Sequence, residues 1–221
     1  MYMKKFEFTG ETKILFNDTI LHRIKALVEI KLDCFIVKAG DLGGWIEKEE
    51  NLSQDGNAWV YGNAEVYGDA RVYGDAEVYG DAMVCGDARV CGDARVYGDA
   101  MVCGNAWVCG DARVCGNARV CGNAMVCGNA MVCGDSCVRN PEHILVMGPM
   151  GSRHAYTTFT RNKDGEIKIK CGCFFGNIPE FLDKVKKTHG DNKYGNVYRL
   201  AVQAALEQID TEPIEECVAY I

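Results

Sequence analysis

The chain lacks the features that mark membrane, secreted and nucleic-acid-binding proteins. No apolar run approaches the ~18 residues that a transmembrane helix needs, and the basic start MYMKKFEFTG is not followed by the apolar stretch of a secretion signal. Basic residues are in the minority, because 24 Lys and Arg stand against 31 Asp and Glu, which gives a net charge of -7. We therefore expect a cytoplasmic protein with no membrane partner and no general affinity for nucleic acid.

Histidine and the common catalytic motifs are scarce as well. The 221 residues hold four histidines, and they contain no G-x-S-x-G nucleophile elbow, no H-E-x-x-H zinc motif and no phosphate-binding P-loop. Thirteen cysteines are present, which in a secreted chain would indicate disulfides. Without a secretion signal, we expect reduced thiols instead.

The centre of the chain repeats one six-residue unit, G-[DN]-A-x-V-[YC]. Glycine recurs at every sixth position from Gly56 to Gly134, fourteen times without an insertion. Six residues turn an α-helix by about 600°, which would scatter the valines over several stripes, whereas Gly-Asp and Gly-Asn are turn dipeptides. A bend at every sixth residue winds an extended chain into a coil, so the unit is typical of a hexapeptide β-helix.

Side chains alternate along a strand, so the alanine and valine of each unit share one side and are expected to point inward. A small and a larger inward residue resemble the pattern of left-handed β-helices, which have three hexapeptides per turn. Residues i and i+18 then stack at a spacing of ~4.8 Å.

The outward positions are expected to form ladders along three faces, with Tyr and Cys sharing one position of the unit. The first face carries Tyr67, Cys85, Cys103 and Cys121, the second carries Tyr61, Tyr79, Tyr97, Cys115 and Cys133, and the third carries Tyr73, Cys91, Cys109 and Cys127. We interpret these cysteines as small hydrophobic residues, with metal ladders or disulfides as alternatives. No histidine lies inside the repeat to complete a usual zinc set, so we expect no metal.

On an isolated coil these ladders would stay exposed together with Met and Trp side chains. Contiguous apolar patches of this kind usually mark an interface, and identical chains favour closed symmetric assemblies. We therefore predict a homo-oligomer, a trimer as first choice and a dimer as second. The candidate interface residues are Tyr61, Tyr79, Tyr97 and Trp107.

The segment before the repeat carries a family resemblance. Residues 40–47 read GDLGGWIE, residues 51–53 read NLS, and the repeat begins at Gly56. These segments resemble those of a family of phage- and prophage-encoded hexapeptide-repeat proteins, and the resemblance covers roughly residues 20–138. The resemblance implies a left-handed β-helix with a folded N-terminal cap, located in the cytoplasm of the host cell, and it implies little about chemistry. Three pieces of the tail, GSRHAYTTF, KCGCF and THGDNKYG, are similar to a module appended to some phage repeat proteins.

The sequence thus predicts a mainly β fold in three parts. Residues 1–55 form a β-rich cap and lead-in segment, residues 56–138 form a left-handed β-helix, and residues 139–221 form a small α+β domain with an acidic tail. Two helices end that domain, the first capped by Asn177 and closed by Gly190 and the second running from about Asn196 to Ile209. Their inward residues are expected to be Ile178, Phe181, Leu182 and Val185 in the first, and Val197, Leu200, Ala201 and Ala204 in the second.

The C-terminal part also carries the candidate binding site. Residues 153–199 hold ten Lys or Arg and five Asp or Glu, whereas residues 207–216 hold five acids and no base, a tail that either covers the basic face or keeps the chain soluble. The stretch MGPMGSRH offers flexible backbone and polar donors for an anion, with a plain glycine-rich turn as the alternative. The candidate ligand-binding residues are Gly148, Gly151, Ser152, Arg153, His154, Lys184 and Lys187. Cys171 and Cys173 are more typical of structural cysteines than of a zinc site.

Enzymes with this fold need residues that the repeat does not supply. Acyltransferases of the hexapeptide type work as trimers and use a histidine near the groove between neighbouring β-helices, and β-helix carbonic anhydrases use three histidines from the coils. All four histidines of this chain lie outside the repeat. We therefore expect no catalytic residue and no cofactor. The chain is either a rigid scaffold that presents a C-terminal binding domain or, more specifically, a phage antagonist that captures a host defence protein or its nucleotide signal. An acyltransferase-like enzyme is the alternative.

Overall fold

Each hexapeptide of the repeat folds into a two-residue strand made of the variable residue and the valine. The structure is a computed structural model and describes residues 4–212. The repeat strands are β6 (Trp59–Val60), β7 (Glu65–Val66), β8 (Arg71–Val72), β9 (Glu77–Val78), β10 (Met83–Val84), β11 (Arg89–Val90), β12 (Arg95–Val96), β13 (Met101–Val102), β14 (Trp107–Val108), β15 (Arg113–Val114), β16 (Arg119–Val120), β17 (Met125–Val126), β18 (Met131–Val132) and β19 (Cys137–Val138).

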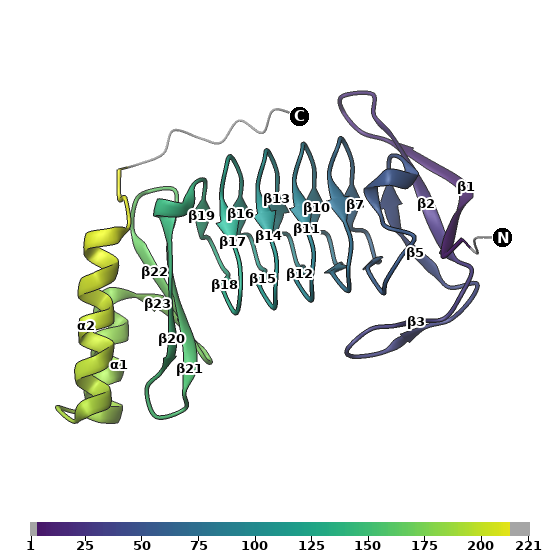
Figure 1. The fold of residues 1–221 in the computed structure, drawn as a ribbon. Coiled ribbons are helices and arrows are strands. Elements are labelled where there is room, and N and C mark those ends of the chain that lie inside the picture. The colour runs from purple at the N-terminus through teal and green to yellow at the C-terminus, as the bar shows by residue number, and fades with distance from the viewer. Residues whose placement is uncertain (1–3, 213–221) are drawn as a thin grey trace.

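These strands stack into three parallel sheets, one per face of a β-solenoid (Figure 1). Every pairing joins residue i to residue i+18, as in Val84 with Val102, and the amide of Met83 donates to the carbonyl of Ala100 at 2.9 Å. Every alanine and valine of the repeat, from Ala58 to Val138, is at most 1 % exposed. The stacking of three hexapeptides per turn and the inward position of Ala and Val are therefore confirmed.

The repeat glycines supply the corners of the coil. Gly86 has a φ of +67°, in the left-handed region that side chains with a Cβ rarely adopt. A Cβ at this position would also lie 3.0 Å from the amide nitrogen of Gly104 in the next coil. Both the turn and the close approach of the coils thus require glycine.

The N-terminal part closes one end of the solenoid. Its strands are β1 (Phe6–Ile14), β2 (Ile20–Ala26), β3 (Ile30–Lys31), β4 (Ile36–Val37) and β5 (Leu42–Ile46), followed by a 3-10 turn at Glu49–Asn51. β2 pairs antiparallel with both β1 and β5, and β5 pairs in parallel with β7, so the cap shares a sheet with the first face. The ring of Phe6 packs edge-on against Trp59, which is 1 % exposed and seals the first coil.

The β3–β4 hairpin reaches over the second face of the solenoid. The ring of Phe35 meets that of Tyr61 at 5.3 Å, and Asp33 forms an ion pair with Arg95. Arg95 also contacts Glu77 at 3.3 Å, between Nε and Oε1, because the two residues stack in adjacent coils. The hairpin therefore covers part of a face that the sequence pattern leaves open.

The C-terminal part is a four-stranded antiparallel sheet covered on one side by two helices. After a 3-10 turn at Pro141–His143, its elements are β20 (Ile144–Met150), β21 (Ala155–Arg161), β22 (Ile167–Cys171), β23 (Phe174–Asn177), α1 (Ile178–His189) and α2 (Lys193–Gln208). Figure 1 shows the sheet between the helices and the last coil. The predicted fold class, mainly β with a β-helix and a small α+β part, is confirmed.

The first helix agrees with its prediction, and in the second the predicted inward residue Ala201 is confirmed whereas Val197 and Leu200 are wrong. α1 has the expected capping box between Asn177 and Glu180 and ends at Gly190. In α2, Val197 and Leu200 are exposed by 39 % and 63 %, and the buried residues are Gly195, Tyr198, Ala201, Val202 and Ala205. The real stripe is rotated by one residue because the large ring of Tyr198 packs against Phe181 and displaces Val197 from the core.

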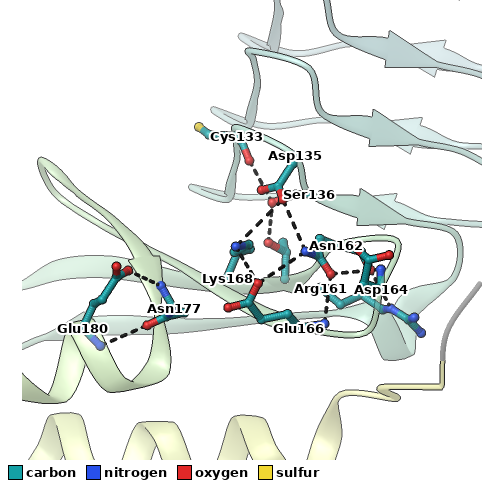
Figure 2. A network of polar contacts seen from close by, with 11 residues as sticks. Cys133, Asp135, Ser136, Arg161, Asn162, Asp164, Glu166, Lys168, Asn177 and Glu180 are labelled. Carbon is teal, nitrogen blue, oxygen red and sulfur yellow. Dashed lines mark hydrogen bonds and ion pairs between the residues drawn. The ribbon is translucent and has the colours of Figure 1, made fainter.

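A polar network joins the C-terminal sheet to the last coil (Figure 2). The Ser136 hydroxyl lies 2.7 Å from that of Thr160 and donates to the carbonyl of Cys133 at 2.8 Å. Asp135 accepts from Asn162 at 3.3 Å and lies 3.8 Å from the Lys168 ammonium. These buried and half-buried contacts fix the orientation of the sheet on the solenoid.

Within residues 4–212, none of the helices combines the length and the apolar character needed to cross a membrane. The predicted acidic stretch covers residues 207–216, and its last four residues, 213–216, lie outside the described residues.

Candidate functional site

A pocket of about 150 Å³ lies on the helical side of the C-terminal part. Three segments form it: the turn between β20 and β21, the turn between β22 and β23, and the two helices. The lining residues are Ser152, Arg153, Ala155, Cys171, Gly172, Cys173, Phe174, Phe181, Lys184, Val185, Thr188, His189 and Tyr198.

The wall of the pocket is aromatic. Phe181 of α1 is buried, the ring of Phe174 is tilted against it at 5.3 Å, and the ring of Tyr198 meets it edge to face at 5.6 Å. The ring of His189 lies 5.6 Å from that of Tyr198. These rings come from β23, α1 and α2, so they hold the helices on the sheet and leave an apolar surface toward the pocket.

The rim carries positive charge. Arg153 comes from the β20–β21 turn and Lys184 from the exposed side of α1. Among residues 4–212 neither side chain forms an ion pair with a carboxylate. Both cations are therefore available to an anion at the pocket mouth, with the Ser152 hydroxyl beside them.

The Tyr198 hydroxyl adds a neutral donor inside the pocket. Burial and the neighbouring Cys171 raise the pKa of Tyr198 to about 12, so the hydroxyl keeps its proton at neutral pH. The Cys171 thiol lies 4.0 Å from this hydroxyl and accepts from the hydroxyl of Thr157 at 3.2 Å. A Cβ on Gly151 would come within 2.0 Å of the Tyr198 oxygen, so glycine is required where the turn crosses it.

The structure brings together some of the predicted ligand-binding residues and separates others. Ser152, Arg153 and Lys184 line the pocket, and Gly151 packs directly behind it. Three others are absent from its lining: Gly148 lies in β20, His154 lies exposed in the turn, and Lys187 pairs with Asp183 at 2.6 Å. The MGPMGSRH stretch is thus a strand end and a hairpin turn, of which only the turn faces the pocket.

Sequence reasoning missed most of the apolar lining. Phe174, Thr188, His189 and Tyr198 line the pocket and are not among the predicted site residues. The helix periodicity held the missing signal, because a stripe through Tyr198, Ala201 and Ala205 is as regular as the predicted one. Cys171, Cys173 and His189 share the pocket, but the described part of the chain contains no group of three or more residues placed to hold a metal ion.

The predicted interface residues do not share one face. Tyr61, Tyr79 and Tyr97 stack with ring centroids 4.8 and 5.0 Å apart, whereas Trp107 belongs to the third face and stacks with Met125. The expectation that the ladders stay exposed is also wrong for many of their members, because stacking and the cap cover them. The ladder residues buried in this way are Tyr67, Cys85, Cys91, Cys121 and Cys133.

Comparison with protein families finds a similarity within the solenoid. The family described as YdcK beta solenoid repeat matches residues 94–110, 112–127 and 118–134. The match supports a β-solenoid repeat and covers neither the cap nor the C-terminal part. A comparison with curated proteins finds no match.

Proposed function

We propose that this chain is a non-enzymatic binding protein in which the β-solenoid is a scaffold and the C-terminal pocket holds a small anionic ligand. The observation that carries the proposal is the pocket itself. It combines two cations without carboxylate partners in the described chain, Arg153 and Lys184, with an aromatic wall. Pockets of this composition bind ligands that carry an acidic group on an apolar body.

The volume narrows the class of ligand. Pockets that enclose a drug-sized molecule usually span ~300–1,000 Å³, and this one is about 150 Å³. A ligand of suitable size for this pocket has one ring, which packs against Phe174 and Phe181, and one phosphate or carboxylate group, which binds Arg153 and Lys184. A larger nucleotide would place only its phosphate or its base inside.

The solenoid supports this role as a rigid body. Its coils are joined by regular backbone hydrogen bonds, and the network around Ser136, Asn162 and Lys168 docks the C-terminal sheet on the last coil. A ligand or partner bound at the helices is therefore presented at a fixed distance from the cap.

The biological setting is the more specific part of the proposal. The segments GDLGGWIE and NLS before the repeat resemble those of phage and prophage repeat proteins, and this resemblance favours action inside a host cell. There the pocket would capture a nucleotide signal, or an acidic group on a host defence protein.

Native mass spectrometry of the protein purified at low salt tests the proposal. We expect a small acidic compound to remain bound to the unmodified chain and to be lost from Arg153→Glu, because the substitution reverses the charge at the rim. Arg89→Glu on the exposed third face of the solenoid is the matched control and should keep the compound. Equal retention by all three proteins, or equal loss from both variants, would contradict the assignment to the pocket.

An acyltransferase-like activity is the second candidate. One observation favours it: His189 lies in the same pocket as the Cys171 and Cys173 thiols, where a histidine is able to act as a general base. Turnover of an acyl thioester that His189→Ala abolishes would support the enzyme and replace the binding role.

A further inference from the structure

Two stacked thiols continue the tyrosine ladder of the second face. Tyr61, Tyr79 and Tyr97 occupy its first three rungs, and Cys115 and Cys133 occupy the next two, toward the C-terminal part. The Sγ atoms of Cys115 and Cys133 lie 2.7 Å apart. In Figure 2 the sulfur of Cys133 points away from the polar network around Ser136.

The register of the coils suits a disulfide between these two residues. β15 and β18 pair in parallel, with Val114 opposite Val132, so the two cysteines stand directly above each other. Stacked Cα atoms at ~4.8 Å fall within the ~4.4–6.8 Å that disulfides span. Closing the bond therefore requires only side-chain rotation.

The surroundings favour a thiolate at one of the two positions. The pKa of Cys115 is lowered to about 6. Hydrogen bonds with the Cys133 thiol and the Tyr97 hydroxyl and the positive charges of Lys170 and Arg113 lower it, and burial opposes them. Its partner responds in the opposite way, because the hydrogen bond to Cys115 and burial raise the pKa of Cys133. Cys115 is half-buried and Cys133 is buried, so the more accessible thiol is also the more acidic one.

The third face provides a matched pair without these cations. Cys109 and Cys127 also stack with their Sγ atoms 2.7 Å apart. Burial and the neighbouring cysteines Cys109 and Cys91 raise the pKa of Cys127 to about 12, with no cation of residues 4–212 among the causes. In the first pair, by contrast, Lys170 and Arg113 act on both thiols. The two pairs share geometry and differ in electrostatics.

We propose that Cys115 and Cys133 form a thiol–disulfide exchange site for low-molecular-weight disulfides. The Cys115 thiolate attacks one sulfur of the small disulfide, an S–S bond forms to Cys115, and the other half leaves as a thiolate that takes up a proton. Cys133 then loses its proton to solvent and attacks Cys115 Sγ, which releases the second half as a thiol. The protein dithiol is oxidised by two electrons, and one small disulfide is reduced to two thiols. In a reducing cytoplasm the pair returns to the dithiol, so the expectation of reduced thiols at rest is preserved.

The size of the rate advantage follows from two opposing effects. At pH 7 a thiol with a pKa of about 6 is roughly 90-fold richer in thiolate than one at the ordinary value of 9.0, but its lower basicity reduces intrinsic nucleophilicity about 20- to 30-fold. The net expectation is a rate about three- to fivefold higher.

The test uses the full-length reduced protein in buffers of reduced and oxidised glutathione. Samples are quenched with acid, alkylated and digested with trypsin, and mass spectrometry follows the peptide Val114–Arg119, whose only cysteine is Cys115. We expect the Cys115–Cys133 disulfide to form at least threefold faster at pH 7 than the Cys109–Cys127 disulfide. The rate of attack by Cys115 should level off above about pH 7, since Cys133, Tyr97, Lys170 and Arg113 hold it as a thiolate.

Three variants separate the steps. Cys133→Ser should trap Cys115 as a mixed disulfide with glutathione. Lys170→Met should slow the attack by Cys115 and move its pH profile upward. Cys109→Ser should change neither the rate of attack by Cys115 nor its pH profile. Equal rates for the two cysteine pairs would overturn the proposal, as would a rate of attack that still rises through pH 9. Failure of Cys133→Ser to form the mixed disulfide, with its circular dichroism unchanged, would also overturn it.

Discussion

The alanine of each hexapeptide is buried in the close-packed interior of the solenoid, so its small side chain limits what fits inside the coil. Ala94 is fully buried among the valines of its own and neighbouring coils. Its position follows from the sequence alone, because alternation along a strand places Ala and Val on one side and the stacking of identical units repeats that choice.

Enlarging this position tests the inside of the coil. Ala94→Leu adds three carbon atoms to a close-packed interior and should lower the free energy of unfolding by about 1–3 kcal/mol. Arg89→Leu changes an exposed outward position and should leave it nearly unchanged. Denaturant unfolding monitored by circular dichroism measures both, and equal losses would show that inward and outward positions have been exchanged. Arg95 is unsuitable as a control because it pairs with the buried Glu77.

Other residue-level features were beyond the sequence. The repeat pattern leaves position 95 solvated, whereas the structure ties it to Asp33 in a distant hairpin. Tyr198 was missed because two stripes of α2 are equally regular and only packing against Phe181 selects between them. Local periodicity determines which residues share a face and does not determine what that face meets.

Among the elements, the connection between the last coil and the C-terminal sheet is held by buried polar groups. His143, in the 3-10 turn at the start of this part, is 3 % exposed, and its Nδ1 accepts from the amide of Arg139 at 3.2 Å. The Arg161 guanidinium, also buried, donates to the carbonyl of Asp210 at 3.0 Å and so anchors the end of α2.

This connection should weaken in acid. Burial, followed by the nearby Arg161, lowers the pKa of His143 below its ordinary value of 6.5. The unfolded chain then binds more protons as the pH falls below about 6.5, so stability that is present at higher pH is lost. We expect the drop in melting temperature from pH 7.5 to pH 5.5 to be smaller in His143→Gln than in the unmodified protein. His154→Gln, in an exposed turn, should keep the full drop, and an unchanged drop in His143→Gln would contradict the assignment.

At the element level, the sequence predicted the coils, the cap and both helices, and it predicted the pocket only in part. The candidate residues near Gly151 and on α1 came from local charge and glycine content. The aromatic wall required knowing that the β22–β23 turn and α2 meet at the same point, which depends on packing between segments far apart in sequence.

At the scale of the whole molecule, the exposed apolar surface is narrower than the repeat implies. The cap hairpin covers Tyr61, and stacking buries much of the first ladder. The third face still exposes Trp107 and Met125, at 38 % and 49 %. These two residues stack in adjacent coils and form the apolar patch on which we base the proposed oligomer.

Light scattering tests this assembly. We expect the unmodified protein at micromolar concentration to have about three times the chain mass of 24.3 kDa, with a dimer as the second choice. Trp107→Glu combined with Met125→Glu should reduce it to the mass of one chain, because charges would be buried in the interface. Tyr79→Glu combined with Tyr97→Glu tests the candidate interface residues of the second face, and loss of the assembly in this variant instead would place the interface there. A mass of one chain for the unmodified protein would contradict the prediction.

The central claim is that the C-terminal pocket, and not the solenoid, binds an anion on an apolar body. Titration calorimetry with phenyl phosphate, whose single ring and phosphate suit the pocket volume, tests it most directly, with inorganic phosphate as the comparison. The account predicts that phenyl phosphate binds more tightly than inorganic phosphate and that its affinity falls with added salt. Arg153→Glu and Lys184→Glu should each abolish binding of phenyl phosphate, whereas Arg89→Glu should leave it unchanged. Binding that survives both pocket substitutions, or that Arg89→Glu removes equally, would contradict it.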